Sequence, residues 1–118
     1  MRLILLAGRS VGLAFAAIVA WLILGLFSYA AGMEVGGPIT SDTTWRLADS
    51  PVFIRTANVR VYAGVTLTIE PGVVVRLDAG RSIYVEGTLV ARGTPQAPIT
   101  FTSNSVTPRP GDWGQVVF

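Results

Sequence analysis

The fold class is decided by residues 58–101, which read NVRVYAGVTLTIEPGVVVRLDAGRSIYVEGTLVARGTPQAPITF. Apolar residues alternate with other residues in short segments, as in Val65, Leu67 and Ile69. This period of two indicates β-strands, because successive side chains of a strand point to opposite faces. Glycine recurs between the segments at eight-residue steps, at Gly64, Gly72 and Gly80. Glycine is suited to these positions because it adopts turn conformations that are unfavourable for residues with a Cβ. Regular short strands of this kind are typical of a sandwich, a barrel or a coiled β-solenoid.

We expect eight strands, at residues 52–55, 59–61, 65–69, 73–77, 82–86, 88–91, 99–102 and 115–118. Their connections are too short for crossover helices, which excludes a doubly wound α/β fold. The dipeptides that favour two-residue hairpins, Asn-Gly and Asp-Gly, do not occur in the chain. The sequence therefore favours a parallel coil, in which each strand pairs with its counterpart one turn later.

Four motifs follow one another in this region. They are LTIEPGVVV at 67–75, V-x-G-x-L-x-A-x-G-T at 85–94, P-I-x-F-T-S at 98–103 and G-x-W-G-x-x-x-F at 111–118. In this order they resemble the opening coils of secreted right-handed parallel β-helix proteins. The resemblance implies an all-β fold that begins a right-handed parallel β-helix over residues 45–118. Most matched residues are apolar, glycine or proline, so the resemblance points to a fold rather than to an activity.

The amino-terminal segment predicts export. Arg2 and Arg9 precede a nearly continuous apolar run at residues 11–27, and the next charge is Glu34. Residues 1–30 are interpreted as a signal peptide, cut after Ser28-Tyr29-Ala30, or as a retained membrane anchor through residues 11–27; a buried soluble helix is the remaining alternative. Both leading interpretations place the rest of the chain across the membrane. Residues 31–44 are expected to be a linker or an entry segment, with the ordered domain beginning near Thr43 or Trp45.

Composition excludes several function classes. All nine basic residues are arginine, and from residue 31 onward seven arginines balance seven acids, so no basic face for nucleic acid is expected. The chain has no cysteine and no histidine. Disulfides, thiolate or histidine metal sites, and Ser–His–Asp or Cys–His catalysis are therefore impossible within it.

The remaining catalytic candidates are carboxylates. Asp78, Glu86 and Asp112 are the acids that could join a calcium or polysaccharide site, as in β-helix lyases and hydrolases. They fall in different strands and corners without a D-x-D cluster, which favours solvated turn residues. Glu70, before the Pro71-Gly72 corner, is interpreted as structural. No catalytic, cofactor or metal site is assigned to this chain.

Other candidates also have structural alternatives. Arg76, Arg81 and Arg92 could meet acidic glycans, although interleaved acids favour cross-strand pairing. Trp45 and Trp113 could stack on sugars, although an end cap and packing over a corner suit them better. Asn58 and Asn104 are expected to join polar ladders between coils.

The sequence ends at Phe118, inside an apolar strand. Because coils bury their apolar faces only against neighbouring coils, we expect the chain to be the leading fragment of a longer exported protein. The favoured function is an exported structural or interaction protein, adhesin-like and glycan-binding, with extracellular glycans or surface proteins as partners. The alternative is the first part of a β-helix polysaccharide lyase or hydrolase with its active site beyond residue 118. A third possibility is that the piece alone is the natural product, held by an uncut helix.

Overall fold

A computed structural model describes residues 32–118. The expected signal peptide or anchor, residues 1–30, lies outside the described residues. Nine strands and one short 3-10 helix follow in chain order: β1 (Met33–Ile39), β2 (Thr43–Trp45), η1 (Leu47–Asp49), β3 (Val52–Val61), β4 (Thr66–Ile69), β5 (Val74–Leu77), β6 (Ile83–Val85), β7 (Thr88–Ala91), β8 (Thr100–Ser103) and β9 (Val116–Val117). Within residues 32–118, no helix is long and apolar enough to cross a membrane.

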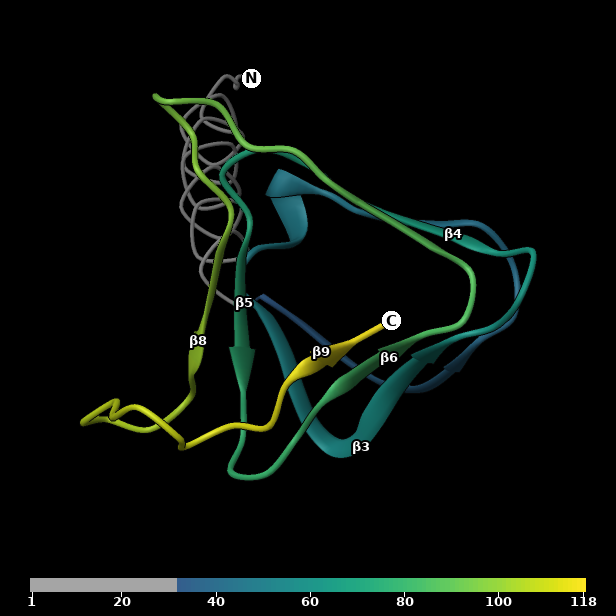
Figure 1. The fold of residues 1–118 in the computed structure, drawn as a ribbon. Helices are drawn as coiled ribbons and strands as arrows, with labels where there is room; N and C mark the ends of the chain where they lie inside the picture. The colour runs from purple at the N-terminus through teal and green to yellow at the C-terminus, as the bar shows by residue number, and fades with distance from the viewer. Residues whose placement is uncertain (1–31) are drawn as a thin grey trace, which may run out of the picture. The chain divides into compact units, whose positions relative to one another are not determined.

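The strands wind into a parallel β-solenoid of about three turns. Every strand pair is parallel, so each strand lies against its counterpart from the neighbouring coil. The ribbon traces a triangular outline with three faces (Figure 1). One face holds β2, β4 and β7; β5 and β8 lie on the second, and β6 and β9 on the third. The predicted all-β parallel coil is confirmed.

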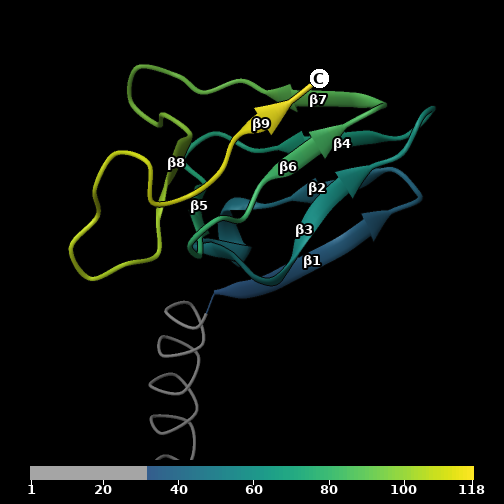
Figure 2. The ribbon, with the colours of Figure 1, turned by 60° about the horizontal axis from the view of Figure 1, so that its bottom comes forward.

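Two long strands bend to serve two faces. In β3, residues 52–54 pair with β5 while residues 59–61 pair with β6, and β1 lies beneath both halves of β3 (Figure 2). The sequence predicted separate strands at 52–55 and 59–61, which the structure joins into one. The register of β1 shifts between Val35 and Gly37, and this irregularity lets the strand follow the same bend.

The expectation that ordered structure begins near residue 43 or 45 is wrong, because β1 begins at Met33. The segment expected to be a linker or an entry segment thus already contains the strands β1 and β2. Exposed and half-buried residues alternate through β1, and Met33, Val35 and Ile39 pack against the core. Two glycines and a proline interrupt this pattern in the sequence and hide its period. Residues 33–39 form a strand because they pair with β3, a contact that the local sequence pattern does not show.

The interior of the solenoid is filled by inward side chains stacked from coil to coil. Val52 lies beside Val75, Ile54 beside Leu77, Val59 beside Ile83 and Leu67 beside Leu89. Seven of these eight are fully buried, and Leu89 is half-buried against them. Because period-two alternation sends every second side chain inward, the same pattern that predicted strands also predicted this core.

Side chains tie each coil to the next at the corners. The oxygens of Asp42, Ser50 and Asn58 accept the backbone N–H groups of Thr66, Val74 and Ser82 at 2.9, 3.0 and 3.0 Å, and each pair is 24 residues apart. Corner backbone leaves the ladder, so its N–H groups need such acceptors. The expected role of Asn58 in a polar ladder is confirmed.

Candidate functional site

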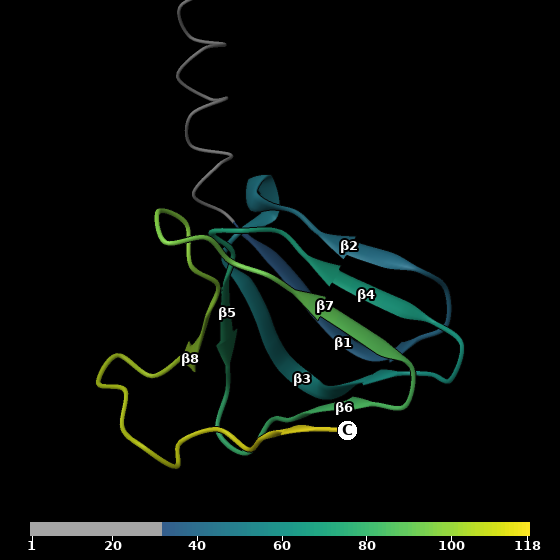
Figure 3. The same ribbon diagram turned by 45° about the horizontal axis from the view of Figure 1, so that its top comes forward.

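A polar cleft opens at the corner between the second and third faces. Its volume is about 550 Å³, and it is lined by Arg55, Asp78, Ala79, Arg81, Ser103, Asn104, Ser105 and Asp112. These residues come from the same corner in successive coils: the bend of β3, the turn between β5 and β6, and the segment after β8. The long connection from β8 to β9 projects from this corner (Figure 3).

Register explains why these side chains meet. Ile54 pairs with Leu77, and Leu77 pairs with Ser103, so the residues that follow them, Arg55, Asp78 and Asn104, continue one line across three coils. Parallel strands about 4.8 Å apart place such side chains within reach of one another. Indeed, Asn104 Nδ2 donates a hydrogen bond of 2.9 Å to Asp78 Oδ1.

Two further contacts fix the rim of the cleft. Arg81 Nε donates to the carbonyl oxygen of Arg55 at 2.7 Å, which orients the guanidinium along the corner. The backbone N–H of Gly80 donates to the carbonyl oxygen of Asp112 at 3.0 Å, which docks the β8–β9 connection against the preceding coil. The cleft is therefore held by contacts between coils.

Asp112 is held by its own turn. Its Oδ2 accepts the backbone N–H of Arg109 at 2.8 Å, and its N–H donates to the carbonyl oxygen of Arg109 at 3.2 Å. Gly111 adopts a φ of +85° in this turn, which favours glycine over residues with a Cβ. The turn thereby presents the carboxylate of Asp112 at the cleft.

The cleft mixes hydrogen-bond donors and acceptors. Arg55 and Arg81 contribute guanidinium groups, and Asp78 and Asp112 contribute carboxylates. Arg55 lies 4.3 Å from the centre of the Phe53 ring and 3.8 Å from Glu34, so its charge is already partly compensated. Within residues 32–118, no group of three or more acids gathers in a way that could hold a metal ion. The arrangement suits a hydroxyl-rich, weakly charged ligand.

The structure separates the three acids singled out from the sequence. Asp78 and Asp112 line one cleft, which the expectation of scattered, solvated acids missed. Glu86 lies on another face and pairs with Arg60. Glu70 is structural as expected, since its Oε1 accepts the N–H of Leu47 at 2.8 Å.

The other candidates also divide. Arg81 reaches the cleft, whereas Arg76 is half-buried on β5 and Arg92 is exposed after β7. Trp45 is only 1% exposed, so it packs in the core and presents no surface to a sugar. Trp113 is half-buried against the core, which confirms the packing interpretation.

Sequence reasoning overlooked Arg55, Ser103 and Ser105 as cleft residues. Aligning the chain by its own coils would have found Arg55, because it takes the place in its coil that Asp78 takes in the next. Asp112 was named among the candidate acids, but coil alignment could not have placed it beside Asp78, because it lies in the long connection between β8 and β9.

Comparisons with known proteins agree with the fold. The family model described as a pectate-lyase-like beta helix domain matches residues 37–118. Protein bark beetle of Drosophila melanogaster is 39% identical over 72 residues, which cover 61% of this chain and 2% of the fly protein. The chain thus spans a small fraction of that relative's length. No solved structure matches the chain significantly.

Proposed function

We propose, on the premise that this chain belongs to the pectate-lyase-like β-helix domain family, that it is an exported structural or interaction module whose corner cleft binds extracellular glycans. The observation that carries this proposal is the cleft itself, where Asp78, Arg81, Asn104 and Asp112 from successive coils share one hollow. A sugar hydroxyl both donates and accepts hydrogen bonds, so paired carboxylate, amide and guanidinium groups complement it.

The polar groups of the cleft are held in place by contacts within the protein and keep further hydrogen-bonding capacity for a ligand. Asp78 Oδ1 accepts a hydrogen bond from Asn104 in the next coil, Asp112 Oδ2 accepts one from Arg109 within its own turn, and Arg81 donates to the adjacent coil. Within residues 32–118, no hydrogen bond occupies the second carboxylate oxygens of Asp78 and Asp112 or the terminal guanidinium nitrogens of Arg81. These atoms are therefore available to a ligand.

Export is proposed from the sequence. The apolar run at residues 11–27, with arginines before it and no charge until Glu34, supports delivery across a membrane by a cleaved signal or a retained anchor.

Binding of the full chain to an array of neutral and acidic glycans tests the proposal. We expect binding to at least one glycan that Ala79→Tyr weakens by blocking the cleft and that Arg81→Ala weakens by removing donors. Val106→Ser is the matched control, because Val106 is 98% exposed and lines neither the cleft nor its rim. Unchanged binding in both cleft variants would assign the glycan to another surface and contradict the proposal.

A β-helix polysaccharide lyase or hydrolase with its active site beyond residue 118 is the second candidate, favoured by the lyase-like description of the family. Cleavage is measured as new chain ends released from pectin and other polysaccharides by the longest natural product of the reading frame. Turnover would establish the enzyme and exclude a purely structural role.

A further inference from the structure

A second surface, formed by residues that the cleft does not use, lies on the outward side of β3 and β6. Arg60 pairs in register with Tyr84. Val61 and Val85, the second residues after Val59 and Ile83, point inward, and the residues that directly follow the ends of the two strands, Tyr62 and Glu86, are exposed again. The four form a square of two tyrosines and two charged residues, here called the tyrosine face.

The two charged residues join across this square. Arg60 Nε donates to Glu86 Oε2 at 3.0 Å, a second guanidinium nitrogen reaches the same oxygen, and the guanidinium also lies 5.6 Å from the centre of the Tyr62 ring. The hydrogen bond to Glu86, followed by the attraction of its charge, raises the pKa of Arg60. Arg60 therefore keeps its positive charge, and that charge lies directly against the carboxylate of Glu86.

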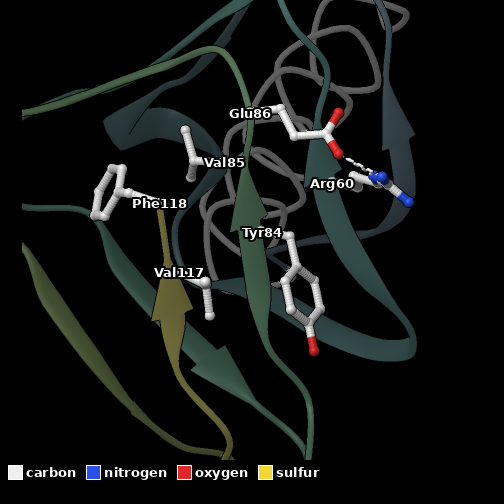
Figure 4. A pocket seen from close by; sticks show the side chains of 6 residues that line it. All are labelled: Arg60, Tyr84, Val85, Glu86, Val117 and Phe118. Carbon is white, nitrogen blue, oxygen red and sulfur yellow. Dashed lines mark hydrogen bonds and ion pairs between the residues drawn. The ribbon is translucent and has the colours of Figure 1, made fainter.

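The tyrosine rings remain accessible. Tyr62, directly after β3, is 41% exposed, and Tyr84 on β6 is 39% exposed. Tyr84 borders a pocket of about 380 Å³ together with Arg60, Glu86 and Val117. Figure 4 shows Tyr84, Glu86 and Arg60 on one side of β6 and Val85 on the other. Coils stack along the solenoid axis, so neighbouring coils do not cover this outward side.

We propose that the tyrosine face is a second glycan site, at which a neutral hexopyranose ring lies against Tyr84 and exchanges hydrogen bonds with Arg60 and Glu86. This proposal rests on the proposed function in taking glycans as the ligand class. The negatively charged face of an aromatic ring attracts the weakly positive C–H groups on one side of a pyranose, and the tyrosine hydroxyl and flanking charges meet its hydroxyls.

The internal ion pair argues for a neutral sugar. An acidic sugar gains most from a guanidinium that is free to form two parallel hydrogen bonds. On this face Glu86 already occupies the guanidinium of Arg60. The sequence predicted only that Arg60 lies in a strand. Because Arg60 pairs with Glu86 in the next coil, we assign it a role in selecting neutral over acidic sugars.

Calorimetric titration of the full chain with cellohexaose, a neutral probe, tests the site in a buffer free of sugar-based detergents. We expect Tyr84→Ala to weaken binding by about five- to tenfold and Tyr84→Phe to stay within about twofold, because stacking needs the ring more than the hydroxyl. Tyr84→Thr removes the ring while retaining a residue that favours strands, and it keeps the test valid if the alanine variant fails to fold. Val106→Ser should bind as the parent does.

A second arm uses hexagalacturonate, an acidic probe, and Glu86→Gln. Removing the carboxylate frees the guanidinium of Arg60, so affinity for hexagalacturonate should rise by about tenfold. No gain in this variant would overturn the assignment of Glu86 as the group that excludes acidic sugars.

The outcomes separate this site from the corner cleft. Cellohexaose binding that is lost in Arg81→Ala but unchanged in Tyr84→Ala would overturn the tyrosine face and leave the proposed function standing. Cellohexaose binding lost only in the tyrosine variants would support the tyrosine face and leave the decision on the cleft to the glycan array. A folded chain that binds no cellohexaose overturns the tyrosine face, while the glycan array decides separately on the proposed function.

Discussion

The side-chain oxygen of Asn58 accepts the backbone N–H of Ser82, 24 residues later, at 3.0 Å. Ser82 makes the equivalent contact with the following coil, since its Oγ accepts the backbone N–H of Gln115 at 3.0 Å. Each coil thus uses a polar side chain to satisfy the corner backbone of the coil above it. Stability in this fold depends on contacts between coils, because no coil buries its interior face alone.

Replacing Asn58 tests this relationship. Asn58→Ala removes the acceptor and leaves the N–H of the buried Ser82 without its side-chain partner, which should cost about 1–3 kcal/mol of unfolding free energy in urea. Asn58→Asp retains an oxygen at this position and should cost less. Equal losses in the two variants would show that the hydrogen bond is unimportant.

Gly87→Ala should be among the most damaging glycine substitutions. A Cβ at Gly87 would collide with the carbonyl oxygens of Val65 and Tyr62, which are backbone atoms and can yield only if the corner shifts. We expect a loss of about 3 kcal/mol in chemical denaturation.

Gly64→Ala is the matched control for that substitution. Gly64 has a φ of +79° and open space around its Cβ position, so only backbone strain opposes alanine, at about 1 kcal/mol. A larger loss at Gly64 than at Gly87 would contradict the steric argument.

The inward stacks should dominate the stability of the solenoid. Leu67 is fully buried between Thr43 and Leu89, and Leu67→Ala should lower the unfolding free energy by about 2–5 kcal/mol. Thr44, on the neighbouring strand, is exposed, and Thr44→Ala should stay within about 0.5 kcal/mol. Similar losses measured for both variants would refute the assignment of inner and outer faces.

The contribution of Arg60 should be independent of pH in the neutral range. Its pKa is raised above the ordinary arginine value, chiefly by the hydrogen bond to Glu86, so whatever stability its charge adds is fully present below that ordinary value and is lost only as pH rises through the higher folded pKa. The difference in thermal midpoint between the parent and Arg60→Met should therefore stay constant from about pH 7 to about pH 9. A difference that shrinks over this range would mean that another titrating group controls the pair.

The fold was largely readable from the sequence, for a local reason. Alternation in residues 65–69 and 73–77 and glycine at the corners express side-chain direction and backbone freedom, which depend on a few neighbouring residues. β1 escaped detection because glycine and proline broke its alternation, and its strand conformation depends on pairing with β3. Local patterns therefore predicted the strands whose apolar residues alternate, and they missed β1, whose strand conformation depends on its pairing with β3.

The candidate sites were much less readable. Asp78 and Asp112 were recognised singly, and their shared cleft depends on how the β8–β9 connection docks on Gly80. Arg60 and Glu86 meet only because the register of β3 and β6 places their coils together.

By itself, the sequence determined that this protein is a parallel coil of short strands with neither cysteine nor histidine chemistry, because side-chain period and composition are properties of the chain alone. The tertiary structure decided which polar residues meet at the corner cleft and which tyrosines and charges form the tyrosine face. Those juxtapositions follow from the register between coils and from the docking of one long connection, and both are set by packing between residues distant in the chain.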